Sequence, residues 1–352
     1  MSVGDLVEWL VVRLLSVFFG AAAILKMLKQ TYRLGFKAVW GKKTFPKPKV
    51  LDDPSLGCHG YLHLEEVRLH YVASGPEDKP LMLFLHGFPE FWFSWRHQIR
   101  EFQKDYRVVA IDQRGYGESD KPADVESYEM TRLMSDVRQT IVALGYRSCV
   151  LVAHDWGGAV AWAFARHFPD MVDRLIVMNA PSQPAFSKLL KSHSAQKKMS
   201  WYLLFFWLPY IPEISLRSNS FTMFDSLFKS LKSSAVELSS AAQQSVNQEE
   251  IAAYKYTFSQ PGALTPPINW YRAAFTKSRQ VRFDMDYVMP VLLIWGVKDV
   301  ALHIDLVAEM KNRCPKMEVK RLEDSGHFVQ NDSPQLVNEA MRGWLEGLGE
   351  GK

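Results

Sequence analysis

The sequence is poor in cysteine and carries no strong charge bias. Its three cysteines, Cys58, Cys149 and Cys314, lie far apart along 352 residues, which argues against a disulfide framework and a C-x-x-C metal knuckle. Lys and Arg number 42 and Asp and Glu 38, so the charge balance gives no indication of nucleic-acid binding or of a polyanionic partner. No internal repeat and no low-complexity tract is present. The length therefore indicates one large globular domain with an elaboration, or at most two domains.

One long hydrophobic run lies near the N-terminus, at residues 9–25. Arg13 is its only charged residue, and the run is close to the minimum length that crosses a hydrocarbon layer about 30 Å thick. The acidic residues Asp5 and Glu8 precede it, whereas basic residues dominate the segment 26–49. The positive-inside bias predicts a single-pass anchor with the rest of the chain in the cytosol, and we expect the endoplasmic reticulum membrane. A soluble packing helix and a removed signal peptide remain the alternatives.

Beyond residue 60, short β-rich runs alternate with helical patterns. Helical periodicity is present at residues 127–144 and 159–167. Alternation of this kind predicts βαβ units and a mostly parallel sheet with helices on both faces. The predicted strands are residues 67–72, 81–85, 107–111, 149–152, 175–178, 291–294 and 318–322.

The stretch from Pro184 to Gln280 breaks this alternation, and its largely helical pattern predicts an insertion that caps the sheet. It carries a cluster of aromatic residues that either form the core of this lid or line an apolar channel: Trp201, Tyr202, Phe205, Phe206, Trp207 and Tyr210. We therefore divide the chain into an N-terminal anchor with a basic linker (1–50), a first core part (51–183), a lid (184–280) and a second core part (281–352). The proline-rich segment 44–54 is expected to be an extended spacer.

A sharp strand–turn–helix elbow is predicted at A-H-D-W-G-G, which follows the strand ending at Val152. Small residues lie two positions to either side of Asp155, at Ala153 and Gly157, because a nucleophile in this turn has a strained backbone that leaves no room for larger side chains there. Serine esterases carry serine at this position, and G-x-S-x-G does not occur at this elbow. A carboxylate nucleophile forms an alkyl-enzyme ester instead of an acyl-enzyme. Asp155 therefore predicts substrates with an electrophilic sp³ carbon.

An acid and a histidine follow in the chain order that this elbow requires. Asp299 comes just after a strand in W-G-V-K-D, and His327 lies in D-S-G-H-F after the next strand. Asp299 would orient His327, whose imidazole would take a proton from the water that attacks the ester. The segment L-H-G-F-P predicts that backbone N–H groups of Phe88 and Trp156 form an oxyanion hole.

Several motifs resemble the epoxide hydrolases of the α/β-hydrolase fold, over about residues 60–345. They are H-G-F-P at His86, D-Q-R-G-Y-G at Asp112, H-D-W-G-G at His154, F-S-Q-P-G-A-L at Phe258 and N-W-Y-R at Asn269. The anchor and F-S-Q-P-G-A-L are most similar to the membrane-anchored vertebrate epoxide hydrolases of types 3 and 4. The resemblance implies a mostly parallel eight-stranded sheet with a helical lid, and hydrolysis of an epoxide to a vicinal diol through an aspartyl ester.

The resemblance also implies that lid tyrosines protonate the epoxide oxygen. N-W-Y-R places one of them at Tyr271. Phe205 stands about where soluble relatives carry the second, and Tyr202, one helical turn earlier, is the possible substitute. The implied substrate is a lipophilic epoxide, for example of a fatty acid, with no cofactor, no metal and no nucleic-acid partner.

Two alternatives to this function remain. A haloalkane or haloacid dehalogenase of the same fold also uses an aspartate elbow, but it commonly has a halide-binding Asn or Trp where this chain has Phe88, and it lacks the tyrosine of N-W-Y-R. A catalytically inactive membrane-bound binding protein is disfavoured because no member of the catalytic set is missing. An N-x-S sequon at Asn331 follows His327 closely, so a glycan there would obstruct the site, which weighs against a lumenal location.

Overall fold

The protein is described by a computed structural model that covers residues 3–233, 248–274, 287–314 and 316–348. Eight strands of the described chain form one sheet in the order β1-β2-β4-β3-β5-β6-β7-β8. Pairings β1 with β2 and β2 with β4 are antiparallel, and all others are parallel. The strands are β1 (Cys58–His63), β2 (Arg68–Ser74), β3 (Leu81–Leu85), β4 (Arg107–Ile111), β5 (Cys149–His154), β6 (Val172–Met178), β7 (Val291–Gly296) and β8 (Glu318–Leu322).

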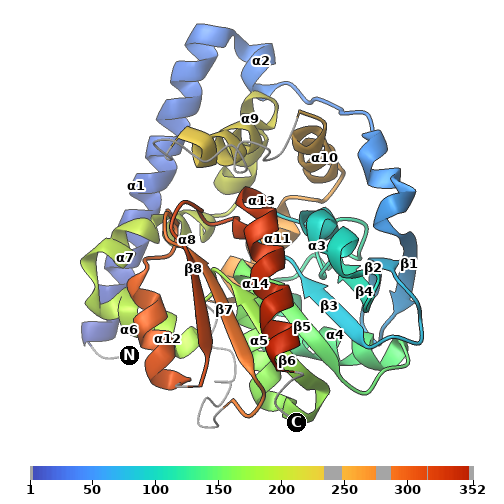
Figure 1. The fold of residues 1–352 in the computed structure, drawn as a ribbon. Helices are drawn as coiled ribbons and strands as arrows, with labels where there is room; N and C mark the ends of the chain where they lie inside the picture. The colour runs from blue at the N-terminus through green and yellow to red at the C-terminus, as the bar shows by residue number, and fades with distance from the viewer. Residues whose placement is uncertain (1–2, 234–247, 275–286, 315, 349–352) are drawn as a thin grey trace.

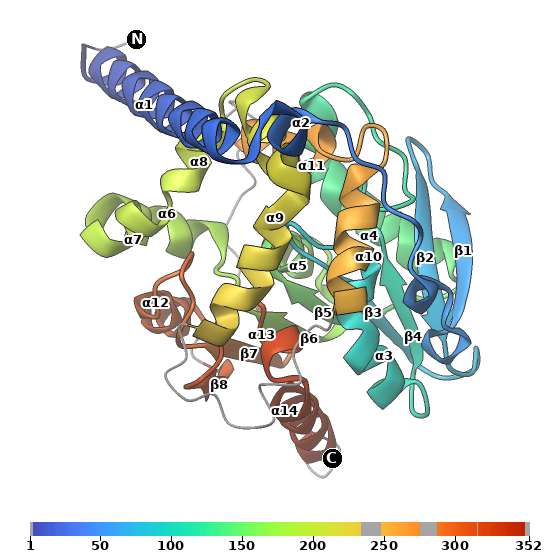
Figure 2. The same cartoon turned by 90° about the horizontal axis from the view of Figure 1, so that it is seen from above.

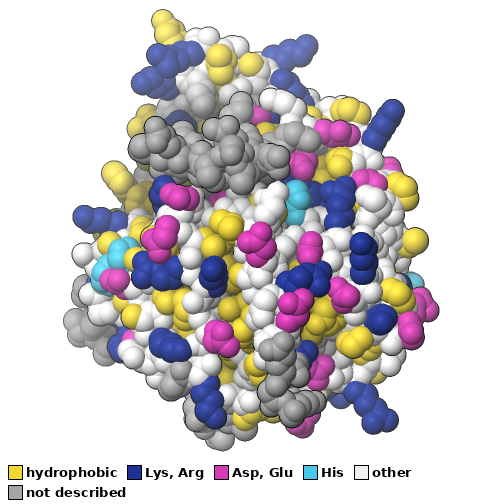
Figure 3. Space-filling view, viewed as in Figure 1, with side chains coloured by type: hydrophobic (Ala, Val, Ile, Leu, Met, Phe, Trp, Pro, Cys, Tyr) yellow, Lys and Arg dark blue, Asp and Glu magenta, His cyan; other side chains and the backbone are white. Residues whose placement is uncertain are grey.

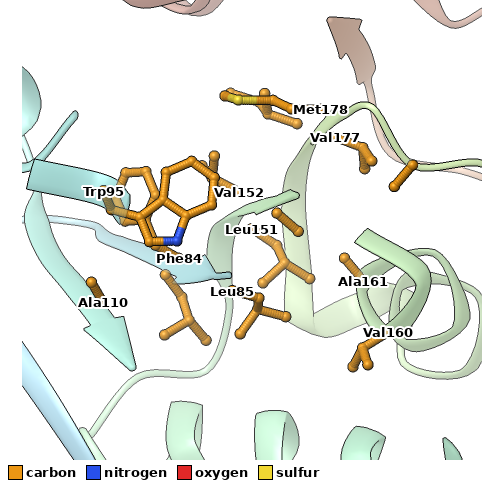
Figure 4. Close-up of a cluster of buried hydrophobic side chains, with 14 of the residues drawn as sticks. Phe84, Leu85, Trp95, Ala110, Leu151, Val152, Val160, Ala161, Val177 and Met178 are labelled. Carbon is orange, nitrogen blue, oxygen red and sulfur yellow. The ribbon is translucent and has the colours of Figure 1, made fainter. Parts of the chain in front are cut away.

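The central strands are apolar on both faces because helices cover both faces of the sheet. Every residue of β3 and of β5 is buried, as expected of parallel strands between two helical layers. Helices α3 (Arg96–Phe102) and α14 (Pro334–Gly347) lie on one face, and α4 (Met130–Ala143) and α5 (Asp155–His167) on the other (Figure 2). Figure 4 shows side chains of these layers meeting around Phe84, Leu151 and Val152. This core fixes the strand ends that carry the site.

The helices between β6 and β7 form the predicted insertion, called the lid here. Its members are α6 (Gln183–Ser192), α7 (Ser194–Met199), α8 (Trp201–Phe206), α9 (Ile211–Ser233), α10 (Gln248–Ser259) and α11 (Thr265–Ala274). In Figure 1, α9 and α10 lie above the sheet and α6 and α7 lie beside it. Helix α9 is interrupted at residues 218–221, where three residues have positive φ. The expected end of the lid at residue 280 lies outside the described residues. After β7, α12 (Asp305–Arg313) packs against α6, and the short α13 (Val329–Asp332) precedes α14.

The predicted fold class is confirmed, whereas several element bounds differ from the sequence expectation. Strand β1 was not predicted, because it is an edge strand in which Leu62 alone is buried, so it lacks a hydrophobic pattern. Strand β6 begins three residues before its most hydrophobic part, with the exposed Asp173. Helix α5 begins at Asp155 rather than at residue 159, because the glycines of the elbow mask its start in the sequence. Short 3-10 turns are at Lys49–Asp52, Pro54–Leu56, Trp92–Trp95, Glu126–Tyr128 and Pro169–Met171.

The N-terminal helix α1 (Val3–Leu34) packs along the lid (Figures 1 and 2). Ser16, Gly20 and Met27 form a buried stripe, and a Cβ at Gly20 would lie 2.7 Å from Leu208 Cδ1 of the lid. The Phe19 ring lies 5.5 Å from that of Trp201. The opposite face exposes apolar side chains, which include Leu14, Val17, Phe18, Leu25 and Leu28. By length and composition, its segment Leu10–Leu34 could cross a membrane, with a mean hydropathy of 2.0.

The segment that follows α1 and α2 (Phe36–Trp40) is extended, but it is packed against the protein rather than a free spacer. Phe45 contacts Phe221 of α9 with ring centroids 6.0 Å apart, and Leu51 is buried. The Val50 N–H donates to Glu249 Oε1 of α10 at 3.3 Å. The expectation of a spacer was wrong because it weighed the prolines and lysines and not the apolar residues between them.

Candidate active site

The predicted elbow is a sharp turn from β5 into α5. Asp155 opens the helix with φ of 49°, a left-handed conformation that is strained for a residue with a Cβ. A Cβ at Gly157 would lie 2.3 Å from the Leu85 carbonyl oxygen, and one at Gly87 would lie 2.4 Å from Asp155 Cβ. The glycines therefore allow two backbone segments to approach the Asp155 carboxylate.

Asp155, His327 and Asp299 come together from the ends of three strands. His327 Nε2 lies 3.4 Å from Asp155 Oδ2, and His327 Nδ1 lies 2.7 Å from Asp299 Oδ2. The Asp299 side chain is fully buried, while 17 % of the Asp155 side chain is exposed. The exposed carboxylate is the one that a substrate can reach, and the buried one orients the imidazole.

Charges within the cluster set its protonation. Burial lowers the pKa of His327, but the carboxylates of Asp299 and Asp155 outweigh burial and hold that pKa well above its ordinary value. Burial raises the pKa of Asp155, but His327, His154 and the Phe88 N–H outweigh it, so the pKa lies below its ordinary value. The resting site therefore holds an ionised Asp155 beside a protonated His327.

Phe88 and Trp156, the residues expected to form an oxyanion hole, lie beside the Asp155 carboxylate. The Phe88 N–H donates to Asp155 Oδ1 at 2.8 Å. Trp156 is the second residue of α5, where a backbone N–H has no partner within the helix and is available to a substrate or an intermediate. The N-terminal turn of α5 adds the positive end of the helix dipole at the same point.

Both expected lid tyrosines face the elbow. The Tyr271 ring packs edge-on against Trp156 at 5.1 Å and against Phe88 at 5.3 Å. The Tyr202 ring packs edge-on against Tyr271 at 6.0 Å. Burial and the Asp155 charge raise the pKa values of Tyr202 and Tyr271, so both phenols are protonated and can donate a hydrogen bond. Both tyrosines are therefore close enough to Asp155 for its charge to change their pKa values.

Phe205 does not share this position. Its ring packs against Trp201 at 5.9 Å and Phe206 at 5.7 Å, within the same helix. Tyr202, one turn earlier, contacts Tyr271 instead.

Buried polar residues around the cluster were not found by sequence reasoning. Asn179, with φ of 38°, donates to Asp299 Oδ2 at 2.7 Å. His154 donates from Nε2 to the His327 carbonyl oxygen at 2.8 Å, and its Nδ1 lies 2.7 Å from Glu90 Oε2. The available signals were His154 and Asn179, at or directly after the ends of the apolar strands β5 and β6, and Glu90, in the loop that follows β3.

Comparisons with known proteins agree with this geometry. The family model described as alpha/beta hydrolase fold matches residues 80–334. The chain is 39% identical to human Epoxide hydrolase 4 over 94% of this chain and 91% of that one. It is 42% identical to Epoxide hydrolase 3 of Xenopus tropicalis, over 87% of this chain and 83% of the relative.

A solved structure supports the same grouping. The epoxide hydrolase of Bacillus megaterium, in complex with an inhibitor, superposes with a TM-score of 0.73 and 33% identity, over 82% of this chain and 100% of that chain. The resemblance noted in the sequence is thereby confirmed over most of the chain. The protein belongs to the epoxide hydrolases of the α/β-hydrolase fold.

Proposed function

We propose that the protein hydrolyses lipophilic epoxides to vicinal diols through a covalent ester on Asp155. The proposal depends on the three groups that lie around the Asp155 carboxylate. The Phe88 N–H holds one oxygen, His327 lies beside the other, and the protonated Tyr271 packs over the elbow through Trp156. These are the groups needed to open the ring and then to cleave the ester.

The reaction proceeds in two balanced steps. An oxygen of Asp155 attacks an epoxide carbon, the carbon–oxygen bond of the ring breaks, and Tyr271, assisted by Tyr202, protonates the leaving oxygen. His327 then returns its resting proton to the tyrosinate that ring opening leaves. Held by Asp299, the neutral imidazole takes a proton from water as the hydroxide attacks the ester carbonyl. The Phe88 and Trp156 N–H groups stabilise the tetrahedral oxyanion. Its collapse releases the diol and regenerates the carboxylate, so one water is consumed per epoxide.

The substrate is proposed to be an apolar epoxide, such as that of a fatty acid. Aromatic rings lie around the reacting carboxylate. The ring centroids of Phe88 and Phe206 are 5.2 Å apart, and those of Phe206 and Tyr271 are 4.7 Å apart. A few polar groups among apolar walls are typical of sites for lipophilic ligands.

We expect the purified protein to hydrolyse lipid epoxides faster than small polar epoxides. A panel of fatty-acid epoxides, styrene oxide and a short polar epoxide would measure kcat/KM, with Asp155→Asn as the inactive control. Chloroalkanes in the same panel test the dehalogenase alternative, for which halide release is the readout. Activity confined to small polar epoxides would contradict the substrate class, and no turnover of any epoxide would contradict the function.

We further propose that α1 anchors the protein in the endoplasmic reticulum membrane as a single pass, with the catalytic domain in the cytosol. The exposed apolar face of α1 and the basic residues that follow it support this proposal. The buried Asn331 sequon offers no glycan site, since its amide oxygen accepts from Arg96 Nη1. A spanning helix would give up the contacts of Phe19 and Gly20 with the lid, whereas a helix lying in the interface would keep them.

We expect replacement of Leu14, Phe18 and Leu25 by aspartate to release the protein from membranes. Each aspartate in the centre of a span costs about 2.5–3.5 kcal/mol, while these exposed side chains leave the lid contacts intact. Resistance to carbonate extraction is the measurement, and Val142→Asp, an exposed position on α4, is the control. Protection of the wild-type catalytic domain from protease in sealed microsomes would contradict the cytosolic orientation. An N-terminal sequon tag that stays unglycosylated would contradict the single pass.

We also propose that residues 1–50, 51–183, 184–280 and 281–352 act as anchor, first core part, lid and second core part. The start of α6 at Gln183 and the return to the sheet at β7 support this division.

A further inference from the structure

Two histidines and an aspartate meet at the surface where the lid contacts the core. This lid–loop cluster consists of His193, between α6 and α7, and of His303 and Asp305, which follow the catalytic acid in the chain. His193 Nε2 lies 3.2 Å from Asp305 Oδ2, and His303 Nδ1 lies 3.4 Å from the same oxygen. One potential ligand atom from each residue lies within 4.8 Å of the other two. Figure 3 shows histidine and acidic side chains together at the level of α7.

The spacing in the lid–loop cluster fits a tetrahedral metal ion. Zinc binds imidazole nitrogen and carboxylate oxygen at about 2.0–2.2 Å, which places neighbouring ligand atoms of a tetrahedron roughly 3.3–3.5 Å apart. The two measured separations, 3.2 and 3.4 Å, are close to this edge length. The side chains of His193, His303 and Asp305 are 30%, 29% and 55% exposed, so an ion can reach them from solvent.

Both imidazoles of the lid–loop cluster accept a backbone N–H that coordination of a metal ion would replace. His303 Nδ1 accepts the Asp305 N–H at 3.2 Å, so this nitrogen carries no proton. It nevertheless faces the Asp305 carboxylate, which is also an acceptor. A metal ion on this nitrogen would take over the lone pair that accepts the Asp305 N–H and would lie between the imidazole and the carboxylate. At His193, Nδ1 accepts the Gln196 N–H at 3.3 Å. Coordination through Nε2 would move the ring proton to Nδ1 and lose this long bond.

The lid–loop cluster lies on a seam that already connects the lid with the loop of Asp299. Gln196 is buried, its Oε1 accepts the His303 N–H at 2.7 Å, and its Nε2 donates to the Ala301 carbonyl at 3.0 Å. Asp299 Oδ1 in turn accepts the N–H groups of Ala301 and Leu302 at 2.7 and 2.9 Å. An ion at this position would therefore connect lid residue 193 with the segment that positions the catalytic acid.

We propose that His193, His303 and Asp305 bind one divalent transition-metal ion of the zinc class, with water as the fourth ligand. The bound ion fixes the α6–α7 segment of the lid to the loop that follows Asp299. Imidazole and carboxylate ligands select such ions over calcium and magnesium, which prefer an all-oxygen shell. The ion takes no part in the chemistry at Asp155.

Calorimetric titration of chelator-treated, tag-free full-length protein with Zn²⁺ tests the site. We expect one ion per chain and a rise in Tm with zinc concentration, because the ion binds the folded state. His193→Asn, which keeps a capping acceptor for α7, and His303→Ala should each weaken binding by at least about 100-fold, since even outer partners of metal ligands contribute 10–100-fold. Asp305→Asn should weaken binding without removing volume.

Control variants separate the lid–loop cluster from other zinc ligands. Cys58→Ser and His167→Ala remove an exposed thiol and an exposed histidine elsewhere, and His327→Gln removes the histidine of the active site; all three should keep the zinc affinity. Near-ultraviolet circular dichroism verifies that each variant is folded. Zinc affinity that is unchanged in His193→Asn and His303→Ala, or lost in His327→Gln, would overturn the site.

Hydrogen exchange tests whether the ion joins the two segments. Zinc should slow amide exchange in peptides that cover both residues 193–200 and 299–306, and His303→Ala should remove both effects. Protection of one segment alone would overturn the proposed connection between the lid and the loop of Asp299.

Discussion

Replacement of His327 by glutamine is expected to stop turnover after the first chemical step and to trap a covalent adduct. Asp155 can still attack the epoxide, but no base remains to activate water against the ester. We expect kcat to fall by at least about 10⁴-fold, the scale of loss when a member of a catalytic triad is removed. Mass spectrometry of the intact protein should show enzyme plus epoxide.

The charges at the site explain why the two steps separate. In the resting enzyme, the carboxylates of Asp299 and Asp155 keep the pKa of His327 high. Ester formation neutralises Asp155, which removes one of those two charges and lowers the pKa of His327. The imidazole can then release its proton, which replaces the one donated by the tyrosine, and act as a base. The nucleophile thus controls when the base becomes available.

Three further measurements make the result specific. Asp155→Ala should form no adduct, and His167→Gln, at an exposed position at the end of α5, should keep full activity. In a single turnover of wild-type enzyme in ¹⁸O-water, the diol should carry oxygen from Asp155 and the label should appear in the Asp155 peptide. Label that passes directly from water into the first diol, with no adduct in His327→Gln, would exclude Asp155 as the nucleophile.

The sequence was sufficient to predict the frame of the site because local patterns encode it. Strands such as β3 and β5 are buried on both faces and give continuous apolar runs, and the residues at their ends are those that meet above a parallel sheet. Asp155 and Asp299 each follow such a run, whereas His327 follows the edge strand β8, in which Leu322 alone is buried. The elbow also has a local sequence signature. Residue 157 must be glycine because a Cβ there would lie 2.3 Å from the Leu85 carbonyl oxygen.

Long-range contacts could not be predicted in the same way. Gln196 binds the loop after Asp299 from another part of the chain, and no spacing rule connects them. Helix α1 was expected to be a plain anchor because it is apolar on most sides. The signal for packing was the helical spacing of Ser16 and Gly20, which places two small residues on the buried side of the helix, together with Met27.

The second lid tyrosine is the part of the site where the structure differs from the position that the sequence motif indicates. The sequence places Phe205 at the position of the second lid tyrosine, whereas the structure directs its ring toward Trp201 and Phe206. Tyr202 packs edge-on against Tyr271 at 6.0 Å, and the charges of Asp155 and Asp299 act on it. We therefore propose that Tyr271 and Tyr202 together bind the epoxide oxygen, and that Phe205 contributes only packing.

Loss of these hydroxyls is expected to slow ring opening and to leave ester hydrolysis largely intact. Tyr271→Phe should reduce the alkylation rate by about 10²–10⁴-fold, the usual contribution of a positioned acid. Tyr202→Phe should act on the same step, and the double variant should be slower than either single variant. Single-turnover kinetics give the alkylation rate, and decay of the preformed ester gives the hydrolysis rate.

The comparison of variants decides which hydroxyl donates the proton. Tyr210→Phe removes a hydroxyl from an exposed lid residue and should change neither rate. Phe205→Tyr should not rescue Tyr202→Phe, because its ring points into the packing of α8. An alkylation rate that is unchanged in Tyr271→Phe and reduced in Tyr202→Phe would transfer the role of acid to Tyr202. If both rates fall together in either variant, the phenol instead positions His327 or water, because an acid that acts only on the leaving oxygen has no effect once the ring is open.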